Sequence, residues 1–297
     1  MRIGNWKLFP VETGRFALDG GAMFGVVPRT LWEKKNPPDE RNRVPMALRA
    51  LLARKVDQSG AFTGQNLLVD TGVGDKWSPK LADIYAVDHS QLSIERGLAE
   101  HGLKASDITQ VLLTHLHFDH AGGATRKRED GSIVPTFENA TYYVQKGNLE
   151  WARNPTEKDR ASYLPENWEP LIEAGVLEVI EGQGEFLPGI ELILSFGHTD
   201  AMQLPRFHDK GQSLLYCADL VPTASHIPIP WVMAYDNRPL VTIEEKKSIL
   251  PRAAAEGWWL FFEHDIQGPA AQVVQGPKGF HAGVRSDLGS GSGDLAD

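Results

Sequence analysis

The sequence predicts a mixed α/β (α+β) protein in which β-sheets are covered by helices. Short apolar runs typical of buried strands alternate with segments of helical periodicity along most of the chain. The run WWLFF, Trp258 to Phe262, is apolar at every position, as expected of a strand covered on both faces. The length of 297 residues is large for one domain but common in layered enzymes, and we assign residues 1–285 to a single domain.

The N-terminal third combines an apolar loop, a turn and one clear strand. The stretch from Leu18 to Trp32 is glycine-containing and apolar, which indicates either a loop that covers another part of the protein or ordinary core packing. Lys34 to Arg43 is polar and turn-rich. Asn66 to Lys76 predicts a short buried strand that runs into a glycine-rich turn, with Asp70 at the junction.

The middle of the chain alternates helices and strands. Ser93 to Leu103 has apolar residues on one stripe and a serine suited to cap a helix, and ITQVLLTH, residues 108–115, follows as a β-branched strand. Further strands are predicted at 141–145, 176–180, 190–196 and 213–218, and helices at 147–153 and 167–174.

The C-terminal part predicts a helix and a tail around the WWLFF strand. The helix extends over 243–255, and Pro251 inside it is expected to bend it. The sequence SDLGSGSGDLAD, residues 286–297, has almost nothing to bury, so we predict a flexible tail there.

Composition excludes several classes of function. The formal net charge of −9 argues against nucleic-acid binding, which requires clustered Lys and Arg. Cys217 is the only cysteine, so no intrachain disulfide and no thiolate-rich metal site can form. No apolar run resembles a signal peptide or approaches the length needed to cross a bilayer. These features predict a cytoplasmic protein without membrane association.

The sequence THLHFDHAGG, residues 114–123, places four metal-ligand residue types in six positions. Alternate residues of an extended segment face the same way, so His115 and His117 can address one point. Asp119 and His120 fall where the chain turns and can address a second point nearby. Imidazoles together with a carboxylate suit zinc, and also iron or manganese. A solvated polar loop is the alternative.

Three more ligand candidates follow strands elsewhere in the chain. His198 comes after a strand on a glycine turn, Asp219 follows the strand at 213–218, and His264 follows WWLFF. Each residue alone could be an ordinary surface, core or turn residue. Because all three occur at the carboxyl ends of strands, they form a set that can converge with the histidine motif.

Taken together, THLHFDH, Gly197-His198, Asp219 and His264-Asp265 resemble the successive motifs of the metallo-β-lactamase superfamily, and Asp70 matches its early structural aspartate. The resemblance implies an αββα four-layer sandwich with a dinuclear centre at one edge. It implies the following ligands: His115, His117 and His198 for one metal, Asp119, His120 and His264 for the other, and Asp219 as the bridge.

Such a centre would hold two Zn²⁺ ions, with Fe or Mn as alternatives, and would hydrolyse its substrate through a metal-bridging hydroxide. The catalytic candidates are the bridging Asp219 and Asp119, whose carboxylate could also carry a proton to the leaving group. Asp265 could support His264 or could be a solvent-facing turn residue.

Within the superfamily, the sequence is most similar to the N-acyl homoserine lactonases and the related organophosphate hydrolases. FFEHDIQ resembles their last motif, and LDGGAMFG resembles the early loop that lines their acyl pocket. The candidate pocket residues are Met23, Phe24, Leu31 and Trp32, although core roles remain open for each. β-Lactamases with a cysteine ligand, glyoxalase II enzymes and tRNA-processing nucleases fit less well, because of Asp219, the short C-terminal remainder and the acidic charge, respectively.

One position departs from the lactonase pattern. The lactonases carry a tyrosine shortly after the bridging aspartate, where its hydroxyl can donate to the substrate carbonyl, and Pro222 stands at that offset here. His226 could take over this donor role or could be an ordinary loop histidine.

We therefore predict a dinuclear metallohydrolase that opens a lactone or cleaves a carboxylic ester. A phosphotriesterase or other phosphoester hydrolase is the main alternative, because the same metal pair serves both reactions. An iron persulfide dioxygenase and a noncatalytic binding module are the candidates from other classes. The expected partner is a small ester or lactone, and exposed apolar residues in the early loop could also form a homodimer contact.

Overall fold

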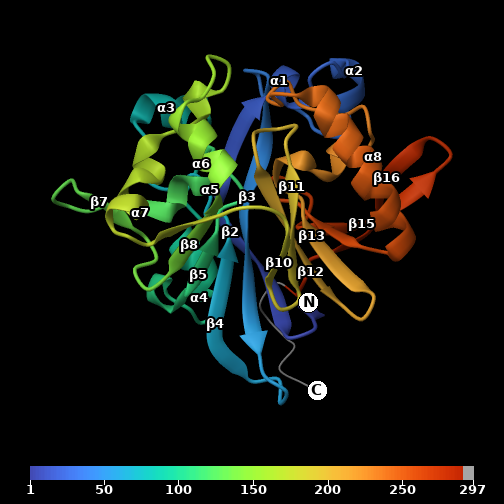
Figure 1. Ribbon diagram of the computed structural model, residues 1–297. Coiled ribbons are helices and arrows are strands. Elements are labelled where there is room, and N and C mark those ends of the chain that lie inside the picture. The colour runs from blue at the N-terminus through green and yellow to red at the C-terminus, as the bar shows by residue number, and fades with distance from the viewer. Residues whose placement is uncertain (290–297) are drawn as a thin grey trace.

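The computed structural model describes residues 1–289 and consists of two seven-stranded β-sheets that face each other, with helices on the outer faces (Figure 1). The first sheet has the order β1-β2-β3-β4-β5-β8-β9 and the second β10-β11-β12-β13-β14-β15-β16. This architecture confirms the predicted mixed α/β class and the four-layer sandwich.

The first sheet is built around a long antiparallel pair, and its far half is parallel. Its strands are β1 (Arg2–Ile3), β2 (Trp6–Asp19), β3 (Arg43–Val56), β4 (Phe62–Val69), β5 (Gln110–Leu112), β8 (Thr141–Gln145) and β9 (Leu177–Ile180). β4, β5, β8 and β9 are parallel, with Val69 opposite Leu112, so their carboxyl ends meet at one edge. The predicted strand at 108–115 is shorter than expected, because the chain leaves the sheet before the histidine motif.

The second sheet is mainly antiparallel. Its strands are β10 (Gly184–Leu187), β11 (Ile190–Ser195), β12 (Met202–Asp209), β13 (Gln212–Tyr216), β14 (Trp259–Phe261), β15 (Ala270–Gly276) and β16 (Gly279–Ser286). β13 and β14 are parallel, and β11 runs in the same direction as both, because it is separated from β13 by the antiparallel β12. The segments that carry His198, Asp219 and His264 therefore leave this sheet at a common edge.

The described residues also contain eight α-helices, several 3-10 turns and a small two-stranded sheet of β6 (Thr125–Lys127) and β7 (Ile133–Pro135). The helices are α1 (Gly20–Phe24), α2 (Arg29–Trp32), α3 (Pro79–Ile84), α4 (Ile94–Ala99), α5 (Phe118–Ala121), α6 (Lys146–Arg153), α7 (Glu169–Glu173) and α8 (Pro239–Glu256). α8 begins four residues before the predicted start, because Pro239 can occupy the first turn, and it is capped after Glu256 by Gly257, which has φ 65°.

Apolar packing explains the layers. One core lies between the sheets, where Leu51 and Leu67 of the first sheet share a cluster with Leu204 and Leu215 of the second. A second core packs the outer face of the first sheet against α4, α6 and α7. A third cluster gathers residues of β2, α1, α2 and the loops beside the histidine motif, and it includes Phe118. This third cluster packs against the histidine motif and supports the candidate site.

The ends and the surface bear on the remaining predictions. Residues 290–297 of the predicted tail lie outside the described residues, whereas Ser286 pairs with Ala270 in the sheet and Leu288 is buried. No helix among residues 1–289 combines the length and the apolarity needed to span a membrane. Val26 and Leu31 expose 87% and 52% of their surfaces, and the homodimer contact proposed for this loop stays a prediction.

Candidate metal centre

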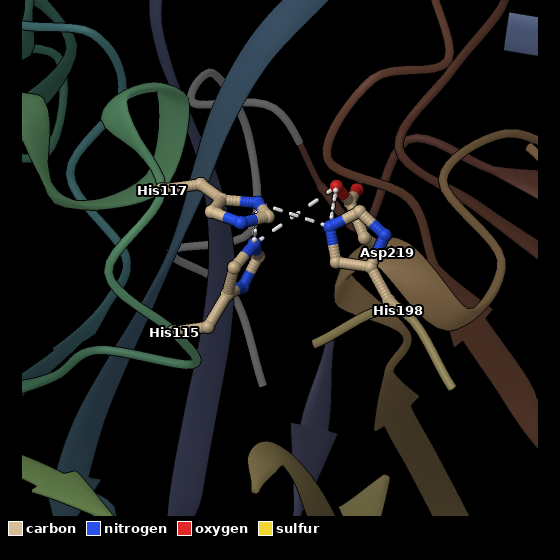
Figure 2. Close-up of side chains that lie close together, drawn as sticks. All are labelled: His115, His117, His198 and Asp219. Carbon is tan, nitrogen blue, oxygen red and sulfur yellow. Dashed lines mark hydrogen bonds and ion pairs between the residues drawn. The ribbon is translucent and has the colours of Figure 1, made fainter. Parts of the chain in front are cut away.

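The predicted ligands meet at one edge of the sandwich, between the carboxyl ends of strands from both sheets. The chain that leaves β5 carries His115 and His117, and the chain that leaves β11 carries His198. Figure 2 shows these three imidazoles and Asp219 pointing toward one another from opposite sides of the site. A Cβ atom on Gly197 would clash with the backbone of Thr242, so glycine is required for this close approach of α8.

The first cluster is formed by His115, His117, His198 and Asp219. Nε2 of His115 lies 3.1 Å from Nδ1 of His117, which is 3.0 Å from Nε2 of His198. Nε2 of His198 is also 3.0 Å from Oδ2 of Asp219. Four ligands at about 2.1 Å from one tetrahedral ion would lie about 3.4 Å apart, so these atoms surround a point suited to a small divalent cation.

The second cluster is formed by Asp119, His120, His264 and the same Asp219. Oδ2 of Asp119 lies 3.8 Å from Nε2 of His120 and 3.6 Å from Nε2 of His264. Asp219 directs Oδ2 toward His120 at 3.5 Å and Oδ1 toward Nε2 of His264 at 3.5 Å. Because Asp219 belongs to both clusters, its carboxylate has the geometry of a bridge between two metal positions.

The polar atoms of the two clusters fit a metal pair. Within the described residues, Nε2 of His120, Nε2 of His264 and Oδ1 of Asp219 are buried and have no hydrogen-bond partner. Buried polar atoms without partners cost free energy, and a cation bound between them would satisfy all three. Imidazole nitrogens combined with carboxylate oxygens suit zinc and also iron or manganese.

Asp70 fixes one histidine of each cluster from behind. It follows β4 directly and has φ 58°, a conformation that Asp adopts more readily than most residues. Its carboxylate accepts hydrogen bonds from N and Oγ1 of Thr114 at 2.7 Å and from Nδ1 of His120 at 3.0 Å. Oγ1 of Thr114 lies 3.0 Å from Nδ1 of His115. Asp70 thereby helps to direct Nε2 of both histidines into the site.

His198 and His264 are oriented by other groups, which contact Nδ1 of each ring. Nδ1 of His198 lies 3.0 Å from Oδ1 of Asp236, and N of Asn237 donates to the carbonyl of His198 at 3.0 Å. Nδ1 of His264 lies 3.0 Å from the carbonyl oxygen of Ala47 in β3. These contacts hold the rings in orientations that leave Nε2 directed at the cluster.

Electrostatics make the site attractive to cations. Burial opposes the charged form of His198, but the carboxylates of Asp219 and Asp236 outweigh it and raise the pKa to about 9. Burial also opposes ionisation of Asp219, yet His198 and His120 hold its pKa well below the usual range. Burial, together with repulsion from neighbouring imidazoles, lowers the pKa of His115 and His117. The ionised Asp219 and the neutral His115 and His117 are the forms that bind a metal, whereas His198 has to release its proton when a metal binds.

A pocket opens onto the two clusters. Besides ligands, it is lined by Leu18, Met23, Tyr85, Phe118, Lys158, Asp159, Ser162, Met233 and Tyr235. Of the predicted pocket residues, Met23 lines the pocket, whereas Phe24 and Trp32 are buried behind it and stack at 5.1 Å between ring centroids. Leu31 is half exposed and does not line it.

His226 does not line the pocket, and its ring nitrogens are not available to donate a hydrogen bond to a substrate. Its ring stacks on Phe24 at 4.8 Å, its Nδ1 lies 2.8 Å from Oγ1 of Thr223 and its Nε2 lies 2.8 Å from the carbonyl of Met23. Both ring nitrogens are therefore engaged within the protein. Lys246 of α8 donates to the carbonyls of His226, Pro228 and Trp231, which fixes this loop from the other side.

Sequence reasoning missed the residues that form the other pocket wall. Tyr235 and Tyr85 line the pocket, and neither hydroxyl makes a hydrogen bond within the described residues. Lys158 donates to the carbonyl of Tyr235 at 2.8 Å. Asp236, which orients His198, also accepts from N of Met233 at 3.2 Å. No local motif marks these residues, and Met233, Tyr235 and Asp236 reach the site only through the path of the 231–237 loop.

A four-layer αββα fold that carries two histidine and aspartate clusters at one sheet edge defines a class of proteins with a binuclear metal centre. The sequence pattern of the metallo-beta-lactamase superfamily matches residues 61–268. The chain therefore belongs to the metallo-beta-lactamase superfamily, as its motifs predicted.

The similar proteins include lactonases. The N-acyl homoserine lactonase of Bacillus cereus is 28% identical over 169 residues, which cover 56% of this chain and 59% of that relative. The N-acyl homoserine lactonase AiiB of Agrobacterium fabrum is 23% identical over 286 residues, which cover 94% of this chain and 100% of AiiB. The chain thus spans less than two thirds of the first relative and the whole of the second.

Solved structures share the whole fold. A probable metal-dependent hydrolase from Staphylococcus aureus is 30% identical, with 97% of this chain and 99% of that chain covered at a TM-score of 0.85. AidC, a dizinc quorum-quenching lactonase, covers 96% of both chains at a TM-score of 0.76 and 19% identity, a likeness that concerns the fold.

Proposed function

We propose that this protein is a dinuclear metal-dependent hydrolase that opens a lactone or cleaves a carboxylic ester, as an N-acyl homoserine lactonase does. The observation that carries the proposal is the bridging position of Asp219, whose two carboxylate oxygens lie against two complete sets of ligands. The lactonases among the similar proteins support the substrate class.

The metals proposed here are two Zn²⁺ ions, and iron or manganese would suit the same ligands. When bound, two divalent cations supply Lewis acidity for the carbonyl and an acidified water at neutral pH. The chain's own contribution is to hold the ligands at short separations in a buried site, where little reorganisation is needed during the reaction.

We assign proton transfer to Asp119. Its carboxylate faces His120 and His264 and also lines the pocket, so it can reach a bound substrate. A carboxylate in this position can accept the proton of the attacking water and deliver it to the alkoxide that leaves when the ester bond breaks. This role is separate from that of Asp219, which lies between the clusters.

Tyr235 is our candidate for the hydroxyl that donates a hydrogen bond to the substrate carbonyl. The lactonases supply this hydroxyl from a tyrosine at the position that Pro222 occupies here. The hydroxyl of Tyr235 has no partner within the described residues, and its ring lines the pocket together with His198 and Asp219. Burial, together with nearby acidic groups, raises its pKa, so the phenol stays protonated and able to donate. A phenol in this position can hydrogen-bond to the carbonyl oxygen of the substrate as that oxygen gains negative charge.

The pocket favours a substrate with an apolar portion. Leu18, Met23, Phe118 and Met233 supply an apolar wall beside the clusters. An acyl chain would bury its surface there, at roughly 25 cal/mol per Å² removed from water. Lys158 and Ser162 line the pocket as well and offer polar contacts to an amide or a ring oxygen.

The test is the kcat/KM of zinc-loaded protein on N-hexanoyl and N-decanoyl homoserine lactones, with Asp219→Ala as the blank. We expect at least about 10⁴ M⁻¹s⁻¹ on one of them, the range of dedicated enzymes, and no activity in the variant. A value orders of magnitude lower, with a higher rate on a phosphotriester such as paraoxon, would replace the lactonase proposal with the phosphoester alternative.

A further inference from the structure

A second buried carboxylate lies behind the metal centre, beyond the ligands and Asp70. Oε2 of Glu263 is 2.8 Å from Nδ1 of His120, on the side of the ring that faces away from the cluster. Oδ2 of Asp70 is 3.0 Å from the same nitrogen. Both carboxylates are fully buried. One imidazole nitrogen, which can carry one proton, is therefore shared by two acidic side chains.

Glu263 is held in this position from two sides. Its Oε2 accepts a hydrogen bond from the hydroxyl of Tyr216 at 2.7 Å, and the Tyr216 ring stacks on Phe261 at 5.1 Å. The backbone around it is fixed by Arg49 of β3, whose Nη1 donates to the carbonyls of Phe262 at 2.8 Å and Asp265 at 3.1 Å. The carboxylate is built into the end of β14 with little freedom to turn away.

The arrangement is unfavourable unless positive charge is present at the site. Oε1 of Glu263 has no hydrogen-bond partner, and no Lys or Arg side chain forms an ion pair with Glu263 or Asp70 among the described residues. Two carboxylates close together in a buried region repel each other strongly. A cation held by His120 would offset this repulsion.

We propose that Glu263 is a positioning residue for the second cluster, the one formed by Asp119, His120, Asp219 and His264. With Asp70 it keeps the proton of His120 on Nδ1, directs Nε2 to the metal position and adds negative charge behind that ligand. In the first cluster, His115 faces only a threonine hydroxyl at this place. The inference rests on the proposed metal centre and assigns Glu263 to one of its two positions.

The experiment compares Zn²⁺ binding by wild type and Glu263→Gln, using titration against a chromophoric chelator that resolves two dissociation constants. We expect one of the two binding equivalents to lose about 10- to 100-fold in affinity, with the other within about twofold. Glu244→Gln, a change of an exposed glutamate on α8, is the matched control and should bind as wild type.

Thermal unfolding provides a readout that a merely structural role would not give. Because Glu263 acts on the bound cation through His120, Glu263→Gln should reduce the increase in Tm on addition of Zn²⁺. A residue needed only for folding would lower the Tm in both states by a similar amount and leave that increase unchanged.

Glu263→Asp, which withdraws the carboxylate by one methylene, is the second variant in case the glutamine does not fold. Wild-type affinities for both zinc equivalents in either folded variant would overturn the inference. If wild type itself binds fewer than two equivalents, the proposed dinuclear centre fails instead, so the two failures are distinguishable.

Discussion

The metal centre and the pocket wall beside it are built in different ways. Each ligand of the centre follows the end of a strand or lies in the motif after β5, and most ligand rings have a second polar group behind them. The wall is formed by loops and short helices whose side chains pack on one another, as Phe24 does on Trp32 and His226. Positions at strand ends are fixed by the sheet, whereas positions on loops depend on many weak contacts.

The largest effect is expected from a change that removes the feature shared by both clusters. Asp219→Ala should reduce kcat/KM by more than about 10³-fold, because both metal positions lose a charged ligand. Metal analysis should show fewer than two bound equivalents. Retention of two tightly bound zinc ions would contradict the bridging role.

A smaller effect is expected from changing Asp236, which contacts both a histidine of the metal centre and the pocket wall. Its carboxylate orients His198 with one oxygen and accepts from N of Met233 with the other. Asp236→Asn should lower metal affinity and kcat/KM by about 10- to 100-fold and also change KM, because the wall moves. An effect on KM alone would mean that Asp236 serves only the wall. Exposed Asp130→Asn is a suitable control.

Tyr235→Phe should lower catalytic activity without affecting metal binding. Loss of one hydrogen bond to the substrate carbonyl is expected to lower kcat by about 10- to 100-fold while both metals stay bound. Tyr85→Phe changes the other phenol of the pocket and serves as the comparison. If the Tyr85 variant loses activity and the Tyr235 variant does not, the donor is Tyr85.

The smallest effect concerns how Lys246 supports the wall, and it depends on pH. Burial lowers the pKa of Lys246 from 10.5 to about 7. Between these values the unfolded chain binds more protons than the folded one, so this lysine makes stability rise as pH increases. Measured by urea unfolding from pH 7 to 9, the stability of wild type should rise relative to Lys246→Met by up to about 1.4 kcal/mol per pH unit. A difference independent of pH would show that Lys246 does not titrate there.

The difference between the metal centre and the pocket wall also explains which features the sequence could predict. The four-layer fold was implied by the resemblance of the motifs to the superfamily, and the candidate ligands were recognisable because His115, His198 and His264 each follow an apolar run that predicts a strand. The long strands β2 and β3 were missed because residues on both of their faces are buried, which removes the alternation that marks a strand.

β12 and the pocket wall were missed for related reasons. Gln203 and Pro205 are buried inside β12, although neither residue type favours a strand interior. Tyr235 and Asp236 lie 16 and 17 residues after Asp219 in a loop without periodicity, so only the folded chain shows that they reach the site. Leu31 was predicted to line the pocket because the early loop resembles that of the lactonases, yet Leu31 on α2 is exposed.

The segment from Met233 to Asn237 has a consequence for altering the specificity of this protein. It carries Met233 and Tyr235 into the pocket and, through Asp236 and Asn237, binds both the ring and the backbone of His198. Libraries that vary this stretch to accommodate new substrates will select for metal retention at the same time, so many variants will be lost as apoprotein. Leu18 of β2 and Met23 of α1 line the pocket from outside this segment and do not orient a ligand histidine, so they are the better starting point for redesign.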